Sequence, residues 1–140
     1  YSSLLESHFR PVPRVLEGLE FRNLGIRAAI DVSDGLINDL GRMCKASGVG
    51  AIIQTEQIPV SDHLKQIFDE EWLVLALSGG EDYELLVTAP EEIIRKAQDI
   101  IDTPITIIGK IVDGDTVKVL DEFAAVVEID EGGWDHFACG

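Results

Sequence analysis

Two carboxylates and a hydroxyl lie close together in the segment Asp31-Val32-Ser33-Asp34-Gly35. The residues before it predict a buried strand and those after it predict a helix. We therefore expect the segment at a strand end, where a helix N-terminus points N–H groups outward. Oxygen donors at such a place suit a hard cation such as Mg²⁺. The alternative is an ordinary helix cap by Ser33 or Asp34. Asp31 discriminates between a cation site and a cap. A helix cap does not require Asp31, whereas a charged group at the end of a buried strand needs a partner.

The second candidate segment is Ser78-Gly79-Gly80-Glu81-Asp82-Tyr83-Glu84, which combines paired glycines with three acids. Glycines allow positive φ angles and a close approach of the backbone to a ligand. Glu81, beside the glycines, is the strongest candidate for binding, whereas Glu84 and to a lesser degree Asp82 fit a surface turn. The chain has no P-loop and no dinucleotide-binding fingerprint.

The third candidate is Gly132-Gly133-Trp134-Asp135-His136-Phe137. The face of Trp134 could stack on a cationic heterocycle, or Trp134 could anchor the tail on the core. Both interpretations stay open for Trp134, and the anchor is favoured for Phe137. His136 has no recognisable Ser or Cys partner, so the sequence does not support a hydrolase.

Periodicity and turn residues predict the elements that must position these side chains. Helices are expected over 14–23, from Ser33 or Asp34 to 47, over 61–69 and after Pro90, and strands over 26–32, 49–55, 83–88, 105–112, 116–120 and 124–129. The apolar run 73–77 is ambiguous, and Asp113-Gly114 signals a hairpin. In the second helix, Leu36, Leu40 and Cys44 fall on the apolar face, with Asp39 and Arg42 largely on the other. We predict one α/β (α+β) domain over residues 1–140, with a mixed β-sheet covered by helices.

Composition narrows the classes of partner. The net charge of −15 repels nucleic-acid phosphates, and no basic stripe offsets it. No apolar run approaches the roughly 20 residues that span a bilayer, and the two cysteines indicate no disulfide framework, so we expect a cytoplasmic protein. The chain starts at Tyr1 and its single methionine is Met43, which predicts that an upstream part is missing.

The order of six motifs resembles the C-terminal half of thiamine-monophosphate kinases, in the aminoimidazole-ribonucleotide-synthetase-like superfamily. The motifs are D-V-S-D-G-L (31–36), A-S-G-V-G-A (46–51), I-P-V-S (58–61), A-L-S-G-G-E-D-Y-E-L-L (76–86), I-G-K-I (108–111) and G-W-D-H-F (133–137). The resemblance covers nearly the whole chain from Pro11 onward. S-G-G-E-D-Y-E-L-L is its most specific element.

The resemblance implies ATP-dependent phosphorylation of thiamine monophosphate to thiamine diphosphate, with several Mg²⁺ ions. By the same resemblance, Asp31 and Asp34 would bind Mg²⁺, Ser33 would contact ATP, and Glu81 and Trp134 would contact thiamine monophosphate. It also implies a homodimer and an N-terminal domain with further metal ligands, which is absent here. No catalytic base is expected, because the attacking phosphate oxygen is already ionised. The alternatives are another ATP-dependent synthetase or maturation enzyme of the superfamily, and a non-catalytic interaction domain.

Overall fold

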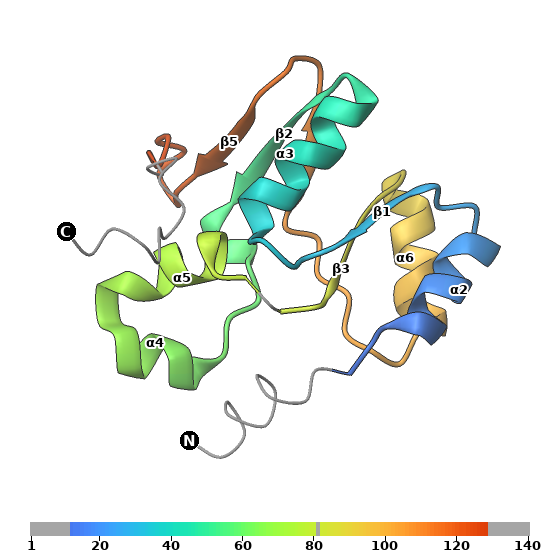
Figure 1. Ribbon diagram of the computed structural model, residues 1–140, viewed down its shortest axis with the longest axis horizontal. Helices are drawn as coiled ribbons and strands as arrows, with labels where there is room; N and C mark the ends of the chain where they lie inside the picture. Colours follow the sequence, from blue (N-terminus) through green and yellow to red (C-terminus); the bar gives the residue numbers. More distant parts are fainter. Residues whose placement is uncertain (1–11, 81, 129–140) are drawn as a thin grey trace.

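The computed structural model describes residues 12–80 and 82–128, and over these residues the chain is an α+β domain, as predicted (Figure 1). None of the helices in these ranges is long and apolar enough to cross a membrane. The elements, in chain order, are α2 (Val15–Asn23), β1 (Ala28–Asp31), α3 (Leu36–Ser47), β2 (Gly50–Gln54), the 3₁₀ turn η1 (Thr55–Gln57), α4 (Asp62–Phe68), the 3₁₀ turn η2 (Asp69–Glu71), α5 (Trp72–Ser78), β3 (Leu85–Thr88), α6 (Glu91–Ile100), β4 (Gly109–Val112) and β5 (Val117–Leu120).

The strands of the described residues divide between two sheets. β1 and β3 form an antiparallel pair in which Asp31 lies opposite Leu85. The second sheet has the order β4-β2-β5, with β4 antiparallel and β5 parallel to β2, so it is mixed as predicted. In Figure 1, α2 and α6 lie together beside the β1–β3 pair, whereas α3 lies along β2.

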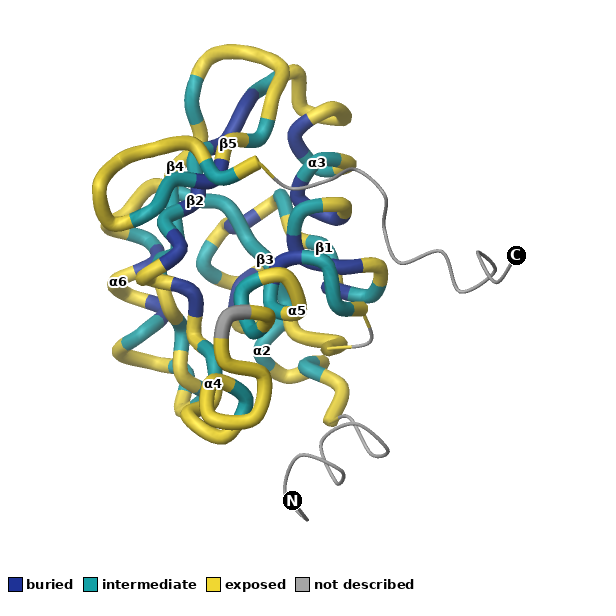
Figure 2. Tube along the Cα trace, turned by 90° about the vertical axis from the view of Figure 1, so that its left-hand side faces the viewer, coloured by how far each residue is buried: buried dark blue, intermediate teal, exposed yellow. Residues whose placement is uncertain are grey.

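Among the described residues, two apolar clusters form the core. The larger cluster joins the buried face of α3 to β2, β5 and α5, through Leu40, Ile53, Leu77 and Val119. Its helical members Leu36, Leu40 and Cys44 recur every four residues, as the periodicity predicted. The smaller cluster packs α2 on α6 through Phe21 and Ala97, and it also contains Ile26 and Ile94. Figure 2 shows buried residues along α3, β2 and β5.

The predicted hairpin at Asp113-Gly114 is wrong, because β4 and β5 pair with opposite edges of β2 and not with each other. The link between them crosses the end of β2. The Ala51 N–H donates to the Thr116 carbonyl oxygen at 3.0 Å, and a Cβ at Gly50 would lie 2.7 Å from that oxygen. A glycine at position 50 therefore leaves room for the link between β4 and β5. The turn residues Asp113 and Gly114 alone did not show that the strands on either side of them pair with β2.

Three other expectations change in detail. The ambiguous run 73–77 is helical and lies in α5. β1 is partly exposed and not fully buried, because its side chains alternate between half-buried and exposed positions. The predicted strand 124–129 is wrong over its described part, where one bridge joins Leu120 to Val126. Ala124 has φ +60°, and this left-handed conformation interrupts an extended chain.

Gly50→Ala should lower the free energy of unfolding by about 1–3 kcal/mol, because the new methyl group overlaps the crossing link. Gly41→Ala is the matched control: Gly41 lies inside α3 with nothing within 4 Å of a Cβ. That change should raise the free energy of unfolding by about 0.5–1 kcal/mol through helix propensity. Denaturant titration of both variants measures the difference. An unchanged midpoint for Gly50→Ala would contradict the crossing.

Candidate functional site

The site predicted from the sequence lies where β1 ends and α3 begins, and the second candidate segment runs directly beside it. The Val32 N–H donates to the Glu84 carbonyl oxygen at 2.9 Å, and the Tyr83 N–H donates to the Val32 carbonyl oxygen at 2.9 Å. The β1–β3 pairing thus continues into the link 32–35. Two motifs that are distant in sequence become neighbours through backbone hydrogen bonds.

Glycines in both motifs allow this approach. Gly35 has φ +106°, and a Cβ on it would lie 2.9 Å from the Ser78 carbonyl oxygen. A Cβ on Gly80 would lie 2.6 Å from the Ser33 carbonyl oxygen. The sequence suggested that the glycines at 79 and 80 bring the backbone close to a ligand. The close approach at Gly80 is instead to the opposing backbone, so this glycine joins the two segments.

The predicted cap by Ser33 or Asp34 is wrong, because Gly35 occupies the cap position and makes no side-chain cap hydrogen bond. Asp39, in the first turn of α3, supplies the acceptor instead. The Ser33 and Asp34 N–H groups both donate to Asp39 Oδ2 at 2.9 Å. Asp39 is only 1% exposed, so its assignment to the polar face is also wrong. An acid in the first turn is the one sequence signal for this role, since a helix N-terminus favours negative charge.

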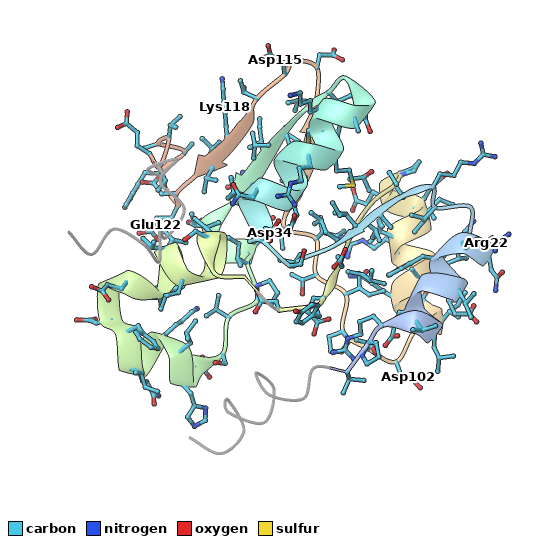
Figure 3. The ribbon with its side chains drawn as sticks, viewed as in Figure 1. Arg22, Asp34, Asp102, Asp115, Lys118 and Glu122 are labelled. Atoms are coloured by element: carbon cyan, nitrogen blue, oxygen red, sulfur yellow. The ribbon has the colours of Figure 1, made fainter. Side chains whose placement is uncertain are left out.

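Arg42 connects the buried carboxylate to an exposed one. Its Nη1 donates to Asp39 Oδ1 at 3.0 Å, and its Nη2 lies 2.6 Å from Asp34 Oδ2. The hydrogen bond with Asp34 raises the pKa of Arg42 above its ordinary value. The side chains of Arg42 and Asp34 are 58% and 54% exposed, and Figure 3 shows Asp34 at the start of α3. Asp34, a predicted metal ligand, therefore forms an ion pair with a cation of the same chain.

The other predicted site residues differ in what the structure shows of them. Asp31 is exposed at the end of β1. The strand end at Asp31 is thus not buried, so the expectation that its charge needs a partner does not hold. Ser33 is half-buried in the link. Glu81 and Trp134 lie outside the described residues.

The segment 82–84 is held at the edge of this site. Arg14 donates from Nε and Nη2 to the two Glu84 carboxylate oxygens, each at 2.8 Å, so Glu84 has a partner within the chain. The pKa of Asp82 is raised, first because nearby protein atoms desolvate its carboxylate and second because Glu84 adds negative charge. Tyr83 has φ +51°, an uncommon conformation for a residue with a side chain. The ion pair between Arg14 and Glu84 and the hydrogen bond from Tyr83 to Val32 fix the path of the segment.

The donors at the end of β1 suit a hard cation in type but do not surround one. Mg²⁺ prefers oxygen ligands in near-octahedral geometry, and Asp31, Ser33 and Asp34 all offer oxygen. Within residues 12–80 and 82–128, no three His, Cys, Asp or Glu side chains are placed to hold a metal together. A surface hollow lined partly by Glu56, Glu91 and Arg95 includes none of the predicted site residues.

Residues 5–122 match the family described as AIR synthase related protein, C-terminal domain, and the chain belongs to this family. Within it, the chain is similar to thiamine-monophosphate kinases. It is 43% identical over 141 residues to the one from Salmonella typhimurium, covering 96% of this chain and 42% of that protein. The chain thus spans less than half the length of that relative.

Solved structures agree with this similarity. The crystal structure of thiamine-monophosphate kinase from Stenotrophomonas maltophilia K279a is 39% identical, with a TM-score of 0.78 over 85% of this chain and 39% of that one. AaThiL complexed with AMPPCP and TMP is 31% identical, with a TM-score of 0.78 over 96% of this chain and 41% of that one.

Asp39→Asn should lower the free energy of unfolding by about 1.5–3 kcal/mol, because a buried charged acceptor for two N–H groups becomes neutral. Asp34→Asn is the matched control, because it neutralises the other carboxylate that pairs with Arg42, and this one is exposed. Its effect should stay below about 1 kcal/mol. Denaturant titration at neutral pH compares the two, and amide hydrogen exchange at Ser33 and Asp34 should accelerate only in Asp39→Asn. Equal losses of stability would contradict the role given to Asp39.

Proposed function

We propose that the full-length protein transfers the terminal phosphoryl group of ATP to thiamine monophosphate, giving thiamine diphosphate. The observation that carries the proposal is the backbone pairing of the link 32–35 with the segment 82–84. It brings Ser33 and Asp34, proposed for ATP and metal, beside the described part of the second motif, residues 82–84. The similarity to thiamine-monophosphate kinases along 96% of the chain supports the same activity, as does the bound AMPPCP, an ATP analogue, in AaThiL.

We assign Mg²⁺ to Asp31 and Asp34, ATP to Ser33, and thiamine monophosphate to Glu81 and Trp134. The exposure of Asp31 and Asp34 at the strand end supports the metal assignment. Asp39 holds the Ser33 and Asp34 backbone in one conformation, so these residues would meet their ligands preorganised.

The chemistry requires positioning and charge compensation more than proton transfer. The attacking phosphate oxygen is ionised at neutral pH, so this chain need not supply a base. Two anionic substrates must meet beside a chain of net charge −15. Bound Mg²⁺ would supply the compensating positive charge, and the residues at the end of β1 would orient it.

The described residues do not complete a metal site, so we propose that the remaining ligands come from a further, N-terminal domain. The chain spans 42% of the Salmonella typhimurium relative, which leaves room for such a domain. A homodimer and a cytoplasmic location belong to the same proposal. An isolated chain of residues 1–140 is then expected to bind ATP with Mg²⁺ weakly.

Asp31→Asn in the full-length protein should abolish most turnover at saturating Mg²⁺ and leave stability nearly unchanged, because the amide keeps the shape but loses the charge. Loss of a metal contact removes several kcal/mol of transition-state stabilisation. Asp115→Asn is the control: Asp115 is exposed in the β4–β5 link, at the opposite end of α3 from Asp34 (Figure 3). Steady-state assays compare the variants, and near-normal turnover in Asp31→Asn would exclude a catalytic metal at this carboxylate.

Glu81→Gln and Trp134→Ala should raise the KM for thiamine monophosphate more than the KM for ATP, because the thiazolium ring is cationic and favours a carboxylate and an aromatic face. Glu84→Gln is the neighbouring control, since Glu84 pairs with Arg14. Glu84→Gln should not change the KM for thiamine monophosphate more than the KM for ATP. Equal changes in both KM values for Glu81→Gln or Trp134→Ala would indicate a structural role for that residue.

A further inference from the structure

Arg42 is anchored at one end of its guanidinium and exposed at the other. Asp39 Oδ1 accepts from Nη1 at 3.0 Å, and Asp39 is itself fixed by the Ser33 and Asp34 N–H groups. The second contact, from Nη2 to Asp34 Oδ2 at 2.6 Å, joins two side chains that are each more than half exposed. The first contact can therefore persist when the second is lost.

We propose that Arg42 occupies the Asp34 carboxylate in the cation-free protein and releases it when a divalent cation binds. This inference rests on the proposed function, which makes Asp34 a metal ligand. The guanidinium contacts Asp34 Oδ2, and a divalent cation bound to the same carboxylate would repel it. Occupation of the Asp34 carboxylate by one cation therefore opposes its occupation by the other.

Release of Asp34 is physically easy because of where the charges lie. Ion pairs between exposed side chains are weak, so a divalent cation with a stronger Coulomb attraction displaces the guanidinium. Arg42 then keeps its hydrogen bond to Asp39, and the buried carboxylate keeps its cation. No buried charge is left unpaired in either state, which avoids the large penalty for breaking a buried pair.

The ion pair also compensates charge in a strongly acidic chain. Asp31 and Asp39 lie on either side of the link 32–35 and Asp34 lies within it, so without a counter-charge their carboxylates would repel one another. Arg42 is bound to two of these three. It thus compensates negative charge at this link before a metal arrives.

The test measures Mn²⁺ binding to the full-length protein by the electron paramagnetic resonance signal of free Mn²⁺. Arg42→Gln should bind Mn²⁺ about two- to five-fold more tightly at one site, the factor that corresponds to an exposed ion pair. Arg95→Gln is the control, because Arg95 pairs with Glu91 at 3.0 Å and both side chains are again more than half exposed. It should leave binding unchanged. In an Asp34→Asn background, which should itself weaken binding, Arg42→Gln should give no gain.

Wild-type protein gives a second measurement, which does not depend on how well Arg42→Gln folds. The Arg42 side-chain Nε–H resonance should shift as Mg²⁺ saturates the site, while that of Arg95 stays constant. An unshifted Arg42 resonance, or unchanged or weaker Mn²⁺ binding in Arg42→Gln, overturns the proposal. In both cases Asp34→Asn would still weaken binding, and the metal assignment would stand. If Asp34→Asn leaves Mn²⁺ binding unchanged, the assignment of Asp34 fails and this proposal fails with it.

Discussion

The arrangement of the site depends on the contacts of the Asp39 carboxylate. It accepts two backbone N–H groups from the link between β1 and α3 and pairs with Arg42, although Asp39 is almost wholly buried. A buried carboxylate is stable only when hydrogen bonds and a counter-charge compensate its desolvation. Here the backbone supplies the first and Arg42 the second. The same hydrogen bonds fix the direction in which the strand passes into the helix.

The pairing of the two motif segments follows from that fixed link. With the link 32–35 held, Val32 continues the β1–β3 ladder through Tyr83 and Glu84. Gly35 and Gly80 let the two backbones approach more closely than a Cβ would permit. Leu77, at the end of α5, is buried in the same cluster as Leu40 of α3. The larger apolar cluster thus positions one motif against the other, and Arg14 fixes the far side by its two hydrogen bonds to Glu84.

Charge gives this site its chemical character. Carboxylates that attract cations are exposed at the strand end, while the chain as a whole carries −15. The proposed reaction between two phosphate-bearing substrates would fit such a surface if cations mediate it. Arg42 already compensates part of the charge at the link. The protein therefore combines a rigid buried carboxylate with an exposed one that is free to exchange partners.

The sequence by itself determined the fold class, the helices with strong apolar periodicity, and the position of Asp31, Ser33 and Asp34 at a strand end. These features depend on neighbours in the chain, and α3 and α6 carry apolar faces that any short window reveals.

Only the tertiary structure decided which polar groups and strands meet. Periodicity placed Asp39 on the polar face of the helix. It could not show that Asp39 is buried, because the backbone N–H groups that make this burial possible belong to the link and not to the helix. Turn residues predicted a hairpin, yet β2 separates β4 from β5, and Gly50 leaves room for the link to cross. Partners of this kind are set by the approach of backbones that are distant in sequence. Local propensity does not encode that approach.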